Sequence, residues 1–186
     1  MILIGLGNKA RQGKDTFALA VMDYYGSQRD TQQVHGLPVM APRVQRVGFA
    51  DELYRICREE YGMVEKDPTL LQNVGMERRL QDPDYWIKKA LGKFSSFTDI
   101  GIITDVRYRN EADAIKSRGG YVVNITRRMA NGAQLIAGDR RADHPSEIEL
   151  DGYPFNFYLV NADGHEALLA QQAICLTEYL RALESK

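Results

Sequence analysis

The stretch LIGLGNKARQGKDTFALAV, from Leu3 to Val21, passes from an apolar run through a glycine-bearing turn into a segment with helical spacing. It comes close to the pattern G-x-x-x-x-G-K-[ST], in which backbone N–H groups surround a phosphate and the lysine reaches its oxygens. Gly13 and Lys14 fit that pattern, whereas Asn8 stands at the first glycine and Asp15 at the hydroxyl position. Asn is the non-glycine residue that best tolerates positive φ. The stretch therefore predicts a phosphate-binding loop, with an ordinary strand-to-helix turn as the alternative.

We expect this loop and the first helical turn to bind the phosphates of ATP through Asn8, Ala10, Arg11, Gln12, Gly13, Lys14, Asp15 and Thr16. Lys14 is expected to face solvent at the start of the helix and to reach the β and γ phosphates. A lysine at a helix N-terminus is unfavourable unless an anion receives it, which favours the phosphate-binding loop over the ordinary turn. Asp15 or Thr16 would serve a Mg²⁺ ion, directly or through water, and which of the two does so stays open.

The composition favours small-molecule chemistry. Among 186 residues there are 24 Lys plus Arg and 25 Asp plus Glu, so no general basic field draws the chain to nucleic acid polymers or membranes. With 44% apolar residues, the chain is expected to form one globular domain over residues 1–186. Cys57 and Cys175 are isolated, which predicts neither a disulfide nor a zinc site. With no signal-like or membrane-length apolar segment, a soluble cytoplasmic protein is expected.

Short apolar runs alternate with segments of helical period. The runs, typical of strands buried on both faces, are residues 2–6, 44–49, 101–104, 121–126 and 157–160. The helical faces contain Leu53, Ile56, Cys57 and Tyr61, then Ile87, Ala90, Leu91 and Phe94, then Leu169, Ala173, Leu176, Leu180 and Leu183. Asp82-Pro83 predicts the start of the second helix, and Gly119-Gly120 the end of a helix that begins near Asn110. The alternation predicts an α/β fold with a five-stranded, mostly parallel sheet covered on both sides.

Two long segments, residues 27–45 and 129–153, follow neither period. Loops of this length in a compact domain are often functional, with disorder as the alternative.

A second polar group follows the apolar run in IGIITDVRYRNEADAI, where Asp105 ends the run and Arg107 comes two residues later. In proteins with a phosphate-binding loop, an acidic residue at the end of a neighbouring strand holds Mg²⁺ or its water shell. An arginine at the same sheet edge can bind a phosphate through two hydrogen bonds. As the alternative, Asp105 caps the next turn and Arg107 pairs with Glu111.

Several motifs together resemble the bacteriophage deoxynucleoside monophosphate kinase family: GNKARQGKDTFA, FADELYRI, LLQNVGMERRLQDPDYWIKKAL, ITDVRYRNEADAIKSRGGYVVNITR and DHPSEIEL. They occur in this order over most of the chain and are specific as a set. Asn8 departs from the family's glycine, and Arg109 stands where the family usually has proline.

The resemblance implies a three-layer P-loop fold of the nucleoside-monophosphate-kinase type with a mobile lid at about residues 128–153 and an acceptor-binding helical region at about 50–98. It implies transfer of the γ-phosphoryl of ATP to a deoxynucleoside monophosphate with Mg²⁺, in the host cytoplasm if a phage encodes the chain. Two alternatives stay open: a kinase of another small phosphorylated acceptor, and a non-catalytic nucleotide-binding protein. The accepted bases, the preferred sugar and whether the chain forms a homodimer also stay open.

The expected residues follow from these patterns. Lys14, Asp105, Arg107 and Arg128 would act on the transferring group, and Asp15 and Asp105 would serve Mg²⁺. The acceptor side would be formed by Asp51, Arg78 or Arg79, Trp86 or Tyr85 as a base-stacking ring, Arg107, His144 and Glu147. For Asp51 the alternative is a helix N-cap, for Arg78 and Arg79 a solvated helical face, and for one of the two rings core packing.

Four arginines bracket the lid segment, as lid arginines would: Arg127, Arg128, Arg140 and Arg141. A closing lid excludes water and brings positive charge to the transferring group. We expect Arg128 to be the catalytic one. His144, Ser146 and Glu147 would contribute to the site or to the lid hinge, and the three scattered histidines predict no metal cluster.

Overall fold

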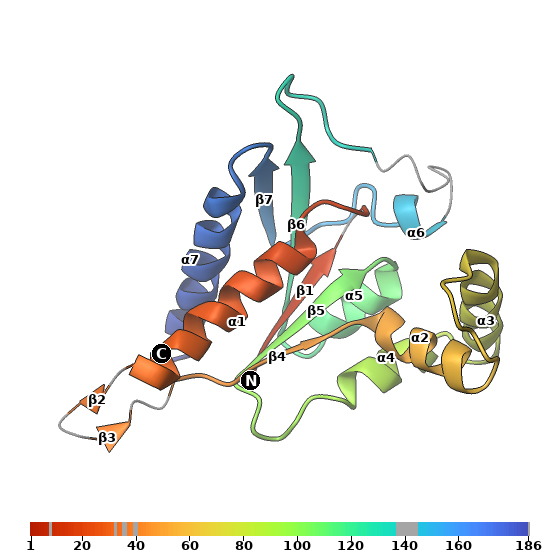
Figure 1. The fold of residues 1–186 in the computed structure, drawn as a ribbon, viewed down its shortest axis with the longest axis horizontal. Coiled ribbons are helices and arrows are strands. Elements are labelled where there is room, and N and C mark those ends of the chain that lie inside the picture. Colours follow the sequence, from red (N-terminus) through yellow and green to blue (C-terminus); the bar gives the residue numbers. More distant parts are fainter. Residues whose placement is uncertain (8, 32, 35–36, 39–40, 137–144, 186) are drawn as a thin grey trace.

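Five parallel strands form one sheet through the middle of the protein in a computed structural model, which describes residues 1–7, 9–31, 33–34, 37–38, 41–136 and 145–185 (Figure 1). The strands are β1 (Ile2–Gly7), β4 (Val44–Val47), β5 (Ile100–Val106), β6 (Tyr121–Arg128) and β7 (Phe157–Ala162). Their order is β4-β5-β1-β6-β7, and every neighbouring pair is parallel. The α/β fold predicted from the apolar runs is confirmed. A separate antiparallel pair, β2 (Gln33–Val34) and β3 (Leu37–Pro38), lies in the segment that the sequence left unassigned.

The central strands β1 and β5 are almost wholly apolar because both faces of the sheet are buried there, whereas the edge strands β4 and β7 have exposed residues, which corrects the expectation that they are buried on both faces. Side chains alternate across a strand, so Leu3 of β1 belongs to one core while Ile4 and Leu6 belong to the other. In β5 the same division separates Ile103 from Ile102. Two separate cores therefore sit on the two sides of the sheet.

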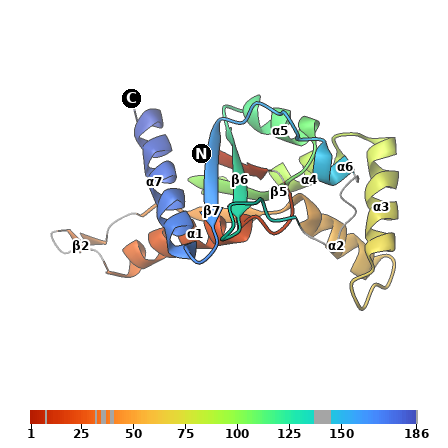
Figure 2. The same cartoon turned by 90° about the horizontal axis from the view of Figure 1, so that it is seen from above.

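Helices cover both faces and complete three layers. On one side lie α1 (Lys14–Thr31) and α7 (Glu166–Glu184), which pack against each other. On the other side lie α2 (Phe49–Glu59), α4 (Tyr85–Leu91) and α5 (Arg109–Lys116). Figure 2 shows α1 and α5 on opposite sides of the sheet. The helix α3 (Pro68–Gln81) is outermost and packs mainly on α2 and α4, and the short α6 (Pro145–Ile148) follows the lid segment (Figure 1).

Two helix starts differ from the expected ones. Asp67 is an N-cap that accepts hydrogen bonds from the N–H groups of Thr69 and Leu70 at 2.9 and 3.0 Å, with Pro68 in the first turn of α3. The Asp82-Pro83 signal is placed differently, since Asp82 ends α3 and α4 begins only at Tyr85. The Asp82 carboxylate still accepts the N–H of Asp84, at 3.1 Å, so it shapes the turn between the helices.

The expected helical faces are otherwise buried or, at Leu53, Leu91 and Phe94, partly buried against the core, with two exceptions. Tyr61 lies beyond the end of α2 and is exposed, and Leu183 in the last turn of α7 is exposed as well. Helix α5 ends at Lys116, and Gly119, at φ 74°, lies in the turn that follows it, close to the predicted stop at Gly119-Gly120.

The order of the strands defines where a ligand would bind. From β1 the chain builds β5 and β4 on one side of the central strand and then adds β6 and β7 on the other. Open α/β sheets bind ligands at the carboxyl ends of the strands where the order reverses. Residues 9–13 lie at that point, directly after β1.

Candidate active site

The loop between β1 and α1 has the backbone of a tight cradle. Arg11 has a φ of 59° and Gly13 a φ of 107°, both in the left-handed region. A Cβ at Gly13 would lie 2.6 Å from Nδ2 of Asn161 and 2.7 Å from Cδ2 of Leu169. Glycine is therefore required at position 13, because of the positive φ and because a side chain would clash with β7 and α7. Asn8, the residue at the first glycine position, lies outside the described residues.

Lys14 is buried, which corrects the expectation that it faces solvent. Its side chain turns back into the loop, where Nζ donates to the carbonyl of Lys9 at 2.5 Å, and the residue is only 7% exposed. Burial, together with the nearby charge of Arg107, lowers the pKa of Lys14 from 10.5 to about 7, although Asp105, Glu147 and Asp15 act in the opposite direction. A desolvated ammonium beside a guanidinium is a place where an anion is strongly favoured.

Glu147 on α6 brings a carboxylate to the same loop. One oxygen accepts the N–H of Ala10 at 3.2 Å, and the other pairs with Nη1 of Arg107 at 3.0 Å. Both side chains of the pair are largely buried. A negatively charged oxygen thus already lies against a loop N–H group, as a phosphate oxygen would.

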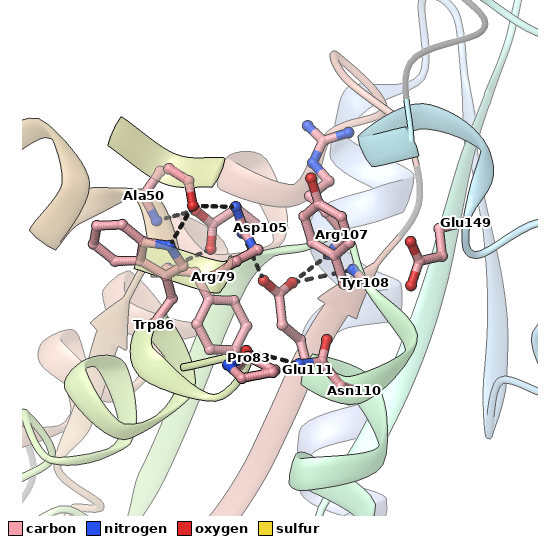
Figure 3. Close-up of polar contacts among 12 residues, drawn as sticks. Ala50, Arg79, Pro83, Trp86, Asp105, Arg107, Tyr108, Asn110, Glu111 and Glu149 are labelled. Carbon is pink, nitrogen blue, oxygen red and sulfur yellow. Dashed lines mark hydrogen bonds and ion pairs between the residues drawn. The ribbon is translucent and has the colours of Figure 1, made fainter. Parts of the chain in front are cut away.

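Asp105 at the end of β5 holds the start of α2. Its two oxygens accept the N–H groups of Phe49 and Ala50 at 2.6 and 2.7 Å (Figure 3). Burial raises the pKa of Asp105, and the two backbone hydrogen bonds oppose that rise. Asp105 therefore caps a helix that is distant in sequence, and each carboxylate oxygen keeps a second lone pair directed elsewhere.

Arg46 links two acidic residues at the edge of the site. Its guanidinium lies 3.3 Å from the carboxylate of Asp51 and 3.5 Å from that of Asp15. The Asp51 carboxylate also accepts the N–H of Gly48 at 2.7 Å, so Asp51 stabilises the first turn of α2 from its third position and Gly48 is the N-cap. Asp15 is the exposed member, with 79% of its side chain accessible.

On the acceptor side, Trp86 is a core residue, which corrects its expected role as a base-stacking ring. It is 2% exposed, and its indole N–H donates to the carbonyl of Gly75 at 3.1 Å (Figure 3). The ring is therefore enclosed by α3 and the helices beside it. Tyr85 packs edge-on against it, with centroids 4.8 Å apart, and is only partly buried.

Arg79 also serves the structure. Its guanidinium lies 3.2 Å from Glu111 and 4.1 Å above the ring of Tyr108, and it donates to the carbonyl of Gly75 at 3.3 Å. The buried Glu111 carboxylate accepts the N–H groups of Arg107 and Tyr108 at 2.8 and 3.1 Å (Figure 3). Burial raises the pKa of Glu111 to about 7 against the opposing charge of Arg79. The sequence alternative paired the Arg107 side chain with Glu111. In the structure the Arg107 side chain pairs with Glu147, and Glu111 pairs with Arg79.

Arg78 is about as exposed as Arg79, but its contacts are longer. Its guanidinium lies 3.5 Å from Glu60, half of whose side chain is exposed, and 5.8 Å from the centre of the Tyr85 ring. Of the two arginines that the sequence left as alternatives, Arg78 is the one held by the weaker contacts.

The first part of the lid segment forms a hairpin after β6. Leu135 donates its N–H to the carbonyl of Arg127 at 2.9 Å, and Met129 donates to Ala133 at 2.8 Å. Arg127 pairs with Asp163 at 2.6 Å. Arg128, the expected catalytic arginine, is partly bonded within the hairpin, where Nη1 donates to the carbonyl of Gly132 at 3.1 Å. Three lid residues named from the sequence lie outside the described residues: Arg140, Arg141 and His144.

The comparisons with known proteins add a partial match. No family model matches the chain. A segment of 76 residues is 40% identical to part of a protein of Acanthamoeba polyphaga mimivirus that carries the name "Putative deoxynucleotide monophosphate kinase". It makes up 40% of this chain and spans 35% of the mimivirus protein. The activity in that name is the mimivirus protein's, of which the matched segment spans about a third. The match bears on the kinase part of the resemblance, and the bacteriophage part stays a prediction.

The arrangement is suited to holding an anion rather than to building a metal centre from protein groups alone. The described residues contain no cluster of three or more His, Cys, Asp or Glu side chains that could hold a metal ion. Mg²⁺ at phosphate-transfer sites keeps waters and binds phosphate oxygens along with one or two carboxylates, and the assignment of Asp105 and Asp15 to such an ion stays a prediction. Within the described ranges, no helix has the length and apolar character needed to cross a bilayer.

Proposed function

We propose that the protein transfers the γ-phosphoryl group of ATP to a deoxynucleoside 5′-monophosphate, giving the diphosphate and ADP. The observation that carries the proposal is the buried, partly neutralised ammonium of Lys14 inside a backbone loop, with the guanidinium of Arg107 beside it. Two desolvated cations at the carboxyl edge of a parallel sheet are stabilised best by a multiply charged anion such as the phosphates of a nucleotide. The partial match to a protein named for this activity supports the same proposal.

On the donor side, the residues bind and neutralise. The loop N–H groups and the positive end of α1 would receive the β-phosphate, and Lys14 would reach the β and γ oxygens. When phosphate enters, the Glu147 oxygen on Ala10 and the Lys9 carbonyl on Lys14 would be exchanged for phosphate oxygens. Mg²⁺, held through Asp105 and Asp15, would supply additional positive charge on the transferring group.

On the acceptor side, the phosphate oxygen of a monophosphate is already a competent nucleophile, so alignment and charge neutralisation are what the protein must supply. We propose Arg107 and Arg78 for the acceptor phosphate, because Arg79 is held by Glu111 and the Gly75 carbonyl. Tyr85, which is only partly buried beside Arg78, is proposed to stack on the base, and Asp51 in the first turn of α2 is proposed to accept a hydrogen bond from a substrate hydroxyl.

A coupled assay of ADP release across deoxy- and ribonucleoside monophosphates tests the proposal. We expect release that requires both ATP and a deoxynucleoside monophosphate, and a loss of about 100- to 1,000-fold in Lys14→Ala, as for removal of one charge-stabilising group from an active site. Lys66→Ala is the matched control, since Lys66 is an exposed lysine far along the chain from the loop.

Other outcomes would favour the alternatives. Turnover with only non-nucleotide phosphorylated acceptors would indicate a different small-molecule kinase. ATP that protects the protein against heating without any turnover would indicate a nucleotide-binding protein that is not an enzyme. Normal turnover in Lys14→Ala would exclude the phosphate-loop assignment itself.

A further inference from the structure

Gln12 lies in the phosphate loop, but its side chain points to the lid hairpin rather than to the cradle. The residue is fully buried. Its Oε1 accepts the N–H of Arg127 at 2.6 Å, and its Nε2 donates to the carbonyls of Ala10 and Leu135, each at 3.0 Å. One side-chain amide therefore joins the loop to both strands of the hairpin.

These bonds complete the hydrogen bonding at the base of the hairpin. Leu135 donates its N–H to the carbonyl of Arg127, while the Arg127 N–H and the Leu135 carbonyl both go to Gln12. The Gln12 amide thus continues the hydrogen-bond ladder of the hairpin as a peptide group would. The hairpin carries Arg128 and leads into the lid segment.

The backbone of the loop presents Gln12 in this direction. Arg11, with its φ of 59°, turns the chain just before Gln12, so that the side chain enters the interior. The carbonyl of Gln12 accepts a hydrogen bond from Nδ2 of the buried Asn161 in β7 at 3.1 Å. Gln12 is therefore held at its backbone by β7 and at its side chain by the hairpin, and any change in the loop backbone acts directly on these bonds.

We propose that Gln12 is a positioning residue that couples occupancy of the phosphate loop to the position of the lid hairpin, residues 127–135. This inference rests on the proposed function, because it takes the loop to be the site of ATP phosphates. Phosphate binding draws the N–H groups of residues 10–13 toward the ligand, and Gln12 transmits that shift to Arg127 and Leu135. The arginine carried by the hairpin is then placed only when the loop is filled, which limits transfer to water.

Hydrogen exchange followed by mass spectrometry tests the coupling in the whole chain at saturating Mg·ATP. In the wild type we expect slower exchange both at residues 10–14 and at residues 127–135. Gln12→Met keeps the length of the side chain and removes its hydrogen bonds. In this variant the loop should still be protected by ATP, whereas the hairpin should lose its ATP-dependent protection. Gln134→Met makes the same change inside the hairpin, on a partly exposed side chain, and should behave as the wild type.

A second variant covers the case in which Gln12→Met fails to fold. Gln12→Glu keeps an acceptor for the Arg127 N–H but faces the carbonyls of Ala10 and Leu135 with an oxygen instead of a donor. Protection by ATP should then persist at Arg127 and be lost at Leu135. In the kinetic readout we expect kcat to fall about 10- to 100-fold, as for a misplaced reacting group, with the KM for ATP changed much less.

The two ideas fail in distinguishable ways. Retained ATP-dependent protection of the hairpin in Gln12→Met, or at Leu135 in Gln12→Glu, would overturn the coupling and leave the proposed function standing. Absence of loop protection by ATP in the wild type would overturn the proposed function itself, before any variant is considered.

Discussion

Lys14 shows how a single residue can oppose folding for the sake of binding. Its ammonium is buried among the loop carbonyls beside Arg107, and its pKa falls to about 7 as a result. The unfolded chain holds the same proton up to the ordinary value of 10.5. Below about pH 7 the lysine is charged in both states, so the folded state then bears the whole cost of burying the charge.

This cost predicts a pH-dependent difference between the wild type and Lys14→Met. Between about pH 7 and 10.5 the unfolded chain binds more protons at this position, so the stability of the wild type rises with pH relative to the variant. We expect Lys14→Met to be the more stable protein near pH 6, with the gap closing as the pH approaches about 10. Urea unfolding of both proteins across this range measures the difference. A gap that does not change with pH would contradict the low pKa.

Arg11 offers a second prediction at the scale of one residue. A non-glycine residue at a φ of 59° costs about 1–2 kcal/mol relative to a right-handed conformation. Arg11→Gly should therefore be about 1 kcal/mol more stable than Arg11→Ala, after allowance for the greater freedom of glycine in the unfolded chain. Comparing the two variants with each other removes the loss of the arginine side chain from the measurement. Equal thermal unfolding of the two would show that the loop relaxes without the turn at this position.

Among the elements, the strands were the most predictable because each falls on a short apolar run, although only the central strands are buried on both faces. The five apolar runs found in the sequence correspond to β1, β4, β5, β6 and β7 within a few residues. Helix α3 is the longest element that the sequence pattern missed. Its N-cap signal, Asp67-Pro68, has the same form as the Asp82-Pro83 signal that was used, but its apolar residues form only a short stripe around Leu71 and Val74.

The sequence offered candidate site residues but not the contacts that they make in the structure. The loop and the end of β5 follow from local patterns. The Glu147 carboxylate on Ala10, however, joins residues 137 positions apart, and the Gln12 bond to Arg127 spans 115. Trp86 was misplaced for a related reason, since a tryptophan on a helix suits either a base or a core until its partner, the Gly75 carbonyl, is known.

The contacts of α3 separate the two arginines that the sequence could not distinguish. Arg79→Ala would leave the buried Glu111 carboxylate without its ion pair. We expect a loss of stability of about 2–3 kcal/mol, somewhat below the range for fully buried pairs because a quarter of the Arg79 side chain is exposed. Arg78→Ala breaks a longer pair, at 3.5 Å, with the half-exposed Glu60 and should cost less than about 1 kcal/mol.

Kinetics should show the reverse order for the same two variants. If Arg78 binds the acceptor phosphate, its loss should raise the KM for the monophosphate about 10- to 100-fold while leaving the KM for ATP nearly unchanged. Arg79→Ala should change the KM for both substrates alike, because it alters the position of α3. A selective effect of Arg79→Ala on the acceptor, with unchanged stability, would reverse the assignment.

For the molecule as a whole, the helices on the two sides of the sheet differ in how closely they pack. The α1 and α7 side is closed by two long helices that pack on each other, whereas α3 on the other side reaches the sheet mainly through α2 and α4. Elements with few buried contacts open at lower free energy. We expect amide exchange in α3 to be faster than in β1, β5 and β6, and to slow selectively when a deoxynucleoside monophosphate is added. Slowing by ATP alone to the same extent would place α3 on the donor side.

The central place of β1 also has a consequence during synthesis. It is made before the other four strands, yet it pairs with residues that come much later, since Ile2 lies opposite Ile100 and Ile4 opposite Tyr121. At about 5–20 residues per second, the growing chain leaves this apolar strand without its neighbours for about 5–20 s. Pairing over such distances is also slow because large loops must close first. The nascent protein therefore exposes its most buried strand for longer than any other, and a ribosome-bound chaperone would find its earliest target there.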